Sequence, residues 1–310
     1  MSTIWITGAR GFIGRHLASH LHQAGHVVLG IGHGAWPEEQ SRQWGLSFWL
    51  NGEVDAHNLQ QLLSQGGCPE AIYHLAGGSA VGTSFLSPLE DFHRTVDSTA
   101  RLLEWIRRDN LETKTICISS AAVYGAGHEG PIPEGAPLSP YSPYGFHKAI
   151  METLCRSYGA NFGVKLALVR FFSIYGAGLE KQLLWDVCRQ LSTDPRRLVL
   201  SGTGREIRDW IHISDAVRLL GLMKDLCDRR VPVVNGGTGT GTSVSDIALR
   251  LCRAWGASAA VDFTGKQRPG DPGSLIADVR SAQAAGFQAR KAQDEGIGEV
   301  VRWYREHHRQ

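Results

Sequence analysis

The fold is decided by Thr3-Ile4-Trp5-Ile6-Thr7-Gly8-Ala9-Arg10-Gly11-Phe12-Ile13-Gly14. Its first five residues form a short β-rich run, which ends in three glycines spaced three apart. Apolar residues at helical spacing follow (Ile13, Leu17 and Leu21), and then a second apolar run over residues 27–31. Strand, glycine turn, helix and strand within about thirty residues predict a βαβ unit.

The glycine turn predicts a binding site for a dinucleotide. Glycines allow a tight turn and let backbone amides approach a diphosphate at the N-terminus of the helix. We expect the cofactor to be bound by Gly8, Arg10, Gly11, Phe12, Ile13 and Gly14. The alternative is a glycine-rich turn that packs closely for structural reasons only.

The end of the second strand lacks a residue that NAD sites usually carry. An acid there normally binds the 2′-hydroxyl of the ribose, but this chain has Gly30-Ile31-Gly32-His33-Gly34. Without the acid, a 2′-phosphate meets no repulsion, and Arg10 and His33 offer it positive charge. We therefore favour NADP over NAD. The alternative is that both cations are solvated and NAD binds without its usual acid.

Two later segments are also expected to reach the cofactor. Glu53 follows the third strand and either accepts a hydrogen bond from the adenine amino group or caps the next helix. Residues 71–78 form a fourth strand that ends in small residues, so Ala76 and Gly77 can approach the cofactor closely. His74, within this strand, is expected to be a structural histidine with its hydrogen bonds satisfied.

A serine, a tyrosine and a lysine are the candidate catalytic residues. Tyr144 and Lys148 are four apart, which places them one turn from each other on a helix. The free pKa of tyrosine is about 10, and a nearby ammonium is expected to lower it. Ser120 ends a buried strand at residues 115–118, and the carboxyl ends of parallel strands are where such sheets bind ligands. The three side chains together suit proton exchange with a substrate hydroxyl during hydride transfer.

Composition excludes several classes of protein. The chain has 310 residues, 20% of them charged, and a net charge of +2, so nothing in the total favours nucleic acid or an anionic membrane. Six scattered cysteines without a Cys-x-x-Cys pair indicate reduced thiols in a cytoplasmic protein, not a disulfide framework or a zinc site. The strand that begins at Thr3 leaves no room for a secretory signal, and no apolar run reaches membrane-spanning length. We expect no metal site; His307 and His308 have nothing nearby to complete a ligand set.

Four motifs, in this order, carry a resemblance to a known family. They are Gly8-x-x-Gly11-x-x-Gly14, Tyr73-His74-Leu75-Ala76-Gly77, Ser119-Ser120-Ala121-Ala122-Val123-Tyr124-Gly125 and Tyr144-x-x-x-Lys148. Together with residues 202–212 and 268–271 they resemble the extended short-chain dehydrogenase/reductases, the nucleotide-sugar epimerase/dehydratase family. The similarity runs from about residue 3 to residue 304.

The resemblance implies an α/β fold and roles for individual residues. It implies a Rossmann-type doubly wound parallel sheet over residues 1–176, which also receives about 209–238. Residues 177–310 would form most of a smaller, partly interleaved substrate domain. Ser120, Tyr144 and Lys148 match the family's catalytic residues. Arg208 and Arg268 match arginines that contact the diphosphate of a nucleotide-sugar, and a guanidinium fork suits phosphate oxygens. Alternatively, Arg208 pairs with Asp209, and Arg268 is a solvated loop charge.

The resemblance also implies a homodimer, formed through the helices that carry Phe92 and Tyr144. Trp185 and Trp210 either stack on the nucleotide or pack in the core, and we favour the core.

Departures from the family pattern narrow the reaction. Ala121 and Ala122 stand where the family's 4,6-dehydratases carry an acidic pair, and alanine is neither an acid nor a base, so dehydration is not expected. Ala122 also leaves no cysteine for the epimerase-reductases that make deoxyhexoses. Ser173 and Thr95 replace asparagines that are usual in the family, which weakens the assignments there.

The sequence therefore predicts hydride transfer at C4 of a nucleotide-diphosphate sugar, and leaves three alternatives open. We favour a 4-keto-sugar reductase that uses NADPH, because the acid is missing at Gly32. A 4-epimerase with tightly bound NAD is the first alternative. The other is a dinucleotide-binding sensor without catalytic activity, against which the intact Ser120, Tyr144 and Lys148 argue.

Overall fold

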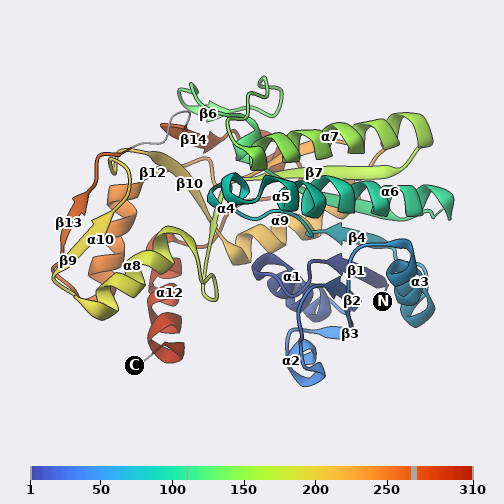
Figure 1. Cartoon of the computed structure of the whole chain (residues 1–310), viewed down its shortest axis with the longest axis horizontal. Coiled ribbons are helices and arrows are strands. Elements are labelled where there is room, and N and C mark those ends of the chain that lie inside the picture. Colours follow the sequence, from blue (N-terminus) through green and yellow to red (C-terminus); the bar gives the residue numbers. More distant parts are fainter. Residues whose placement is uncertain (1, 110, 267–270, 309–310) are drawn as a thin grey trace.

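The computed structural model describes residues 2–109, 111–266 and 271–308. A seven-stranded parallel sheet lies at its centre, with the strand order β11-β7-β5-β4-β1-β2-β3 (Figure 1). The strands are β1 (Thr3–Thr7), β2 (Val27–Gly32), β3 (Leu46–Asn51), β4 (Ala71–His74), β5 (Lys114–Ser120), β7 (Lys165–Phe171) and β11 (Val233–Gly236). The predicted doubly wound α/β fold is confirmed. Strand order reverses between β1 and β4, which is where open sheets of this kind bind their ligands.

Helices cover both faces of the sheet because its strands are apolar on both sides. Ile4 and Ile6 of β1 belong to one core, which α1 (Phe12–Gln23) and α9 (Ile213–Leu226) complete. Trp5, between them, points to the opposite core. That core is completed by α3 (Ala56–Gly66), α6 (Ser98–Arg108) and α7 (Pro143–Phe162). The short α2 (Glu38–Gln43) packs beside β3 and was not predicted.

The long helix that carries Phe92 is interrupted. It begins as α5 (Pro88–Phe92), widens into one π-helical turn (His93–Asp97) and continues as α6. The short α4 (Val81–Leu86) precedes it. π turns insert an extra residue into a helix and are frequent at functional sites. This turn lies beside the cavity described below.

The C-terminal part has its own core. Its sheet contains β12 (Gly241–Ser243), β10 (Ile207–His212), β14 (Ser274–Ala277) and β6 (Pro131–Ile132), with β8 (Ser173–Tyr175) paired to β10. A separate pair is formed by β9 (Arg197–Leu200) and β13 (Ala260–Phe263). The helices are α8 (Gln182–Thr193), α10 (Val244–Trp255), α11 (Arg280–Ala284) and α12 (Gln293–His307). Trp185 and Trp210 pack in this core, as predicted. The cap of α10 is Ser243, which accepts a hydrogen bond from the amide of Asp246.

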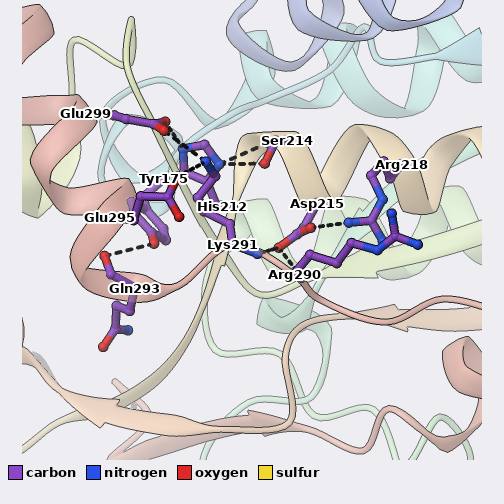
Figure 2. Close-up of polar contacts among 10 residues, drawn as sticks. All are labelled: Tyr175, His212, Ser214, Asp215, Arg218, Arg290, Lys291, Gln293, Glu295 and Glu299. Carbon is purple, nitrogen blue, oxygen red and sulfur yellow. Dashed lines mark hydrogen bonds and ion pairs between the residues drawn. The ribbon is translucent and has the colours of Figure 1, made fainter.

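Polar contacts join the two parts where α9 begins (Figure 2). The buried carboxylate of Asp215 accepts hydrogen bonds from the backbone amides of Arg290 and Lys291, at 3.0 and 2.9 Å, and pairs with Arg218 at 2.6 Å. His212 lies 3.3 Å from Glu299 of α12. We propose residues 1–176 with about 209–238 as the dinucleotide-binding domain and most of 177–310 as the substrate domain.

Candidate active site

One cavity of about 1210 Å³ opens along the carboxyl ends of β1, β2, β4 and β5 and continues toward the C-terminal part. With one exception, every site residue predicted from the sequence lines it: Gly8, Arg10, Gly11, Phe12, Ile13, Gly14, His33, Glu53, Ala76, Gly77, Ser120, Tyr144, Lys148 and Arg208. The exception is Arg268, which lies outside the described residues.

The glycine turn fits the diphosphate of a dinucleotide. Gly8 has φ +70°, and a Cβ built there would lie 2.9 Å from the amide nitrogen of Ala76, so the turn excludes any side chain. A Cβ on Gly14 would overlap the carbonyl oxygen of Gly8. Gly11 precedes α1 and no side chain caps this helix, so its first N–H groups are free for an anion.

The end of β2 holds an aromatic contact in place of the usual acid. A Cβ on Gly32 would lie 3.1 Å from the ring of Trp49, so packing leaves little space for a carboxylate side chain there. His33 is exposed at the cavity wall, and the guanidinium of Arg10 lies beside Gly34. Neither cation is held by an ion pair among the described residues.

The structure tests the expectations for Glu53 and His74. Glu53 does not cap α3, since Asp55 does so by accepting a hydrogen bond from the amide of Asn58 at 2.8 Å. The Glu53 carboxylate lies 3.4 Å from Arg101 at the cavity wall. His74 is a satisfied structural histidine, as predicted: it bonds Thr7 at 2.8 Å and Thr99 at 3.0 Å.

Ser120, Tyr144 and Lys148 converge in the cavity. Ser120 ends β5, and its hydroxyl shares a hydrogen bond with the Tyr144 phenol. The N-terminus of α7 is fixed by its cap Ser142 and by Ser84, whose hydroxyl accepts from the Tyr144 amide at 3.1 Å. The Lys148 ammonium lies 5.8 Å from the centre of the Tyr144 ring. Proton exchange between this phenol and a substrate hydroxyl is therefore geometrically possible.

The expectation that Lys148 lowers the pKa of Tyr144 is wrong for this structure. Burial raises the pKa of the phenol, although the Ser120 hydrogen bond opposes it. The Lys148 ammonium donates a hydrogen bond to the carbonyl oxygen of Ile118 at 2.8 Å, and burial lowers the pKa of this ammonium to about 8. Burial therefore works against both the phenolate of Tyr144 and the ammonium of Lys148, because desolvation disfavours charged forms.

Arg208 does not form the pair with Asp209 that the sequence allowed. The Asp209 carboxylate accepts hydrogen bonds from Thr238, Gly239 and Ala277. The Arg208 guanidinium lies 3.6 Å from Asp271, on the wall of the cavity. Arg208 is mostly buried, and desolvation lowers its pKa. A cavity-lining guanidinium is suited to a diphosphate.

The departures from the family pattern have clear structural roles. Ala121 and Ala122 form a buried 3-10 turn after β5 and line the cavity, so they offer neither acid nor base. Thr95 accepts a hydrogen bond from the Gly78 amide at 2.8 Å and thereby holds the loop after β4. Ser173 begins β8 on the cavity wall.

Comparison with known proteins decides the family. The model of the "NAD dependent epimerase/dehydratase family" matches residues 4–235. The chain belongs to this family. The UDP-glucose 4-epimerase of Azospirillum brasilense is 28% identical, over 95% of this chain and 89% of its own. UDP-glucose 4-epimerase 1 of Oryza sativa is 30% identical, over 91% and 88%. A solved UDP-glucuronic acid 4-epimerase of Bacillus cereus, in complex with UDP-glucuronic acid and NAD, is 27% identical with a TM-score of 0.88, over 98% and 99%.

This epimerase/dehydratase family member is thus an enzyme of the extended short-chain dehydrogenase/reductase type. The comparisons support NAD and give no support to the favoured NADP, because two solved relatives, at 30% and 27% identity, are complexed with NAD. They also support the epimerase alternative better than the 4-keto-sugar reductase that we favoured. No helix among the described residues is long and apolar enough to cross a membrane, and no cluster of three metal-ligating side chains occurs among them.

Three site residues escaped the sequence prediction. Lys181 lines the cavity and follows β8 in the chain. The buried Asp91 and the partly buried His147 form a pair outside the cavity wall. Asp91 and His147 are 56 positions apart, and no sequence pattern connects them.

Proposed function

We propose that the protein is a nucleotide-sugar 4-epimerase that uses bound NAD. The observation that carries this proposal is the convergence of Ser120, Tyr144 and Lys148 in one cavity with the glycine turn. NAD would be held by the turn at Gly8 and by the backbone near Ala76. The nucleotide-sugar diphosphate would bind Arg208 and, as expected from the sequence, Arg268.

The residues perform the proton chemistry of a two-stage reaction. When bound, NAD would supply the hydride acceptor and donor of the reaction, and its oxidised ring would carry a positive charge. Ser120 orients the C4 oxygen, and Tyr144 takes the C4 hydroxyl proton as the C4–H bond breaks and a 4-ketone forms. When hydride returns to the other face of C4, Tyr144 gives its proton back to that oxygen. The products are the C4 epimer and unchanged NAD.

Incubation with UDP-glucose or UDP-glucuronic acid, without added cofactor, tests the reaction. We expect the purified protein to release NAD on denaturation and to form the C4 epimer with no net oxidation, both measured by mass spectrometry and chromatography. If the protein instead reduced a 4-keto nucleotide-sugar with added NADPH and left UDP-glucose and UDP-glucuronic acid unchanged, it would be the reductase.

A second feature favours a substrate with a carboxylate on the sugar. Lys181 lines the cavity and donates a hydrogen bond to the carbonyl oxygen of Ser79 at 3.2 Å. Burial lowers the pKa of its ammonium, and no carboxylate pairs with it among the residues that the structure describes. A desolvated cation without an acidic partner is stabilised when an anionic ligand binds. We infer that this ligand group is the C6 carboxylate of a hexuronate.

Lys181→Met is expected to raise KM for UDP-glucuronic acid by about 10–100-fold, which is the loss of one charge-assisted hydrogen bond. KM for UDP-glucose should change little. The exposed Lys165, which pairs with Glu112, provides the control variant Lys165→Met. Equal losses for both substrates would contradict the inference and assign Lys181 to the diphosphate that they share.

We also propose a homodimer and a cytoplasmic location. Large apolar side chains are exposed together on α4, α5 and α7, the helices around Phe92 and Tyr144: Phe85, Leu86, Leu89, Phe146 and Ile150. These helices pack on one another, and exposed apolar side chains on adjoining elements commonly mark a protein interface. All six cysteines are free thiols, and four of them are buried, which suits a reducing compartment.

A further inference from the structure

A buried carboxylate lies directly behind the acid–base residues. Asp91 on α5 is 6% exposed and is not part of the cavity wall. Its Oδ2 lies 2.6 Å from Nδ1 of His147, which is on α7 immediately before Lys148. The edge-to-face contact between the rings of His147 and Phe92, with centroids 5.5 Å apart, fixes the imidazole. A buried carboxylate needs such a partner, because burying it unpaired is costly.

The same carboxylate supports the cavity wall. Gly78 packs so closely on it that a Cβ built at Gly78 would overlap Oδ1 of Asp91. A Cβ on the neighbouring Gly77 would lie 3.1 Å from the Lys148 ammonium. The Gly77–Gly78 wall is therefore held between Asp91 on one side and Lys148 on the other, and Thr95 fixes the amide of Gly78.

The charge of Asp91 acts on both proton-carrying groups of the site. It favours the ammonium of Lys148, against the burial that lowers its pKa. It also adds to the burial that raises the pKa of Tyr144, because a negative neighbour disfavours the phenolate.

Other ionisable groups also face this region. α5 packs on α4, on α7 and on the π turn. α4 has no ionisable side chain, whereas α7 carries Tyr144, His147, Lys148 and the buried Glu152, whose charge also favours the Lys148 ammonium. On and beside the π turn, Arg94 pairs with Glu90 at 2.6 Å, and His93 lies 3.7 Å from Asp97.

We propose that Asp91, held by His147, is a positioning residue that keeps the Lys148 ammonium in place and supports the Gly77–Gly78 wall. This inference rests on the proposed acid–base roles of Tyr144 and Lys148. Asp91 touches neither the substrate nor the cofactor; it acts through the residues that do.

The test is Asp91→Asn, which keeps an acceptor for His147 but removes the charge. Both limbs of the pH profile of kcat/KM are expected to move to lower pH by about one unit. The Tyr144 phenolate forms more readily, which moves the acidic limb, and Lys148 loses its proton more readily, which moves the basic limb. The control is Asp225→Asn on α9, an exposed carboxylate that lies 3.7 Å from Lys114; its profile should match that of the wild type.

A second measurement does not require turnover. The tyrosinate absorbance of Tyr144, taken as the difference between a protein and its Tyr144→Phe variant, should titrate at lower pH in the Asp91→Asn background. If Asp91→Asn lowered the thermal stability but left the Tyr144 titration and the pH profile of kcat/KM unchanged, Asp91 would have only a structural role. That result would overturn the inference. Absence of epimerisation in the wild type would instead overturn the proposed function, while the absorbance titration still decides the role of Asp91.

Discussion

Replacing Tyr144 by phenylalanine is expected to lower kcat by about 10²–10⁴-fold, which is the usual contribution of a general acid–base group. The change removes only the phenol oxygen, which shares a hydrogen bond with Ser120 and faces the cavity. NAD content after purification should stay near that of the wild type, because the glycine turn is untouched. Steady-state kinetics and the NAD released on denaturation measure the two quantities.

A matched control is available on the same helix. Tyr158 of α7 lies away from the cavity, and its hydroxyl donates a hydrogen bond to Glu104 at 3.1 Å. Tyr158→Phe should leave kcat unchanged. If the Tyr144→Phe variant turned over at the wild-type rate, another group would have to move the C4 proton, and the mechanism proposed above would fail.

The largest loss of stability is expected from Glu152→Gln. Glu152 is fully buried one helical turn after Lys148. It accepts two hydrogen bonds from the Arg170 guanidinium, at 2.8 and 2.7 Å, and one from Ser119 at 2.6 Å. The amide would leave the buried Arg170 charge without its carboxylate partner, which costs about 3–5 kcal/mol of unfolding free energy. Urea unfolding at neutral pH measures this change.

The same carboxylate predicts a pH dependence. Burial raises the pKa of Glu152, but the hydrogen bonds and charge of Arg170 outweigh it, so the net pKa lies below the usual value. Its stabilising contribution is therefore present above the unfolded pKa of about 4.3 and is lost as pH falls through the folded value. The difference between wild type and Glu152→Gln should shrink below about pH 4.

The exposed Glu112, which pairs with Lys165 at 2.6 Å, is the control for both measurements. Glu112→Gln should leave the unfolding free energy nearly unchanged, because exposed ion pairs contribute little to stability. A Glu152→Gln loss as small as this would show that the buried network around Arg170 does not stabilise the strand end that carries Ser120.

The sequence predicts the sheet well because its strands are continuous apolar runs. Residues 27–31 and 115–118, predicted as strands, lie within β2 and β5. Residues 209–212 of β10 gave no such signal, since this strand has polar residues and pairs with the very short β8, β12 and β14. Such pairings depend on contacts between distant segments, and local periodicity does not encode them.

The residues of the candidate site could likewise be predicted where local spacing sets their geometry, and not where contacts between distant segments do. Gly8 and Tyr144 belong to motifs whose spacing encodes their geometry, and both line the cavity. The direction of the pKa shift at Tyr144 was not predictable, because it depends on burial and on Asp91. The cofactor preference was drawn from Gly32 alone, whereas its packing against Trp49 appears only in three dimensions.

The π turn at residues 93–97 lets one helix satisfy two sets of neighbours. One additional residue rotates everything before it by about 100° relative to a regular helix. α6 can therefore keep Leu102 and Ile106 against the sheet while Asp91, about three turns before Leu102, faces His147. An insertion or deletion of one residue in this turn would uncouple the two orientations. Variation in the length of this helix among related proteins should therefore accompany variation at positions 91 and 147.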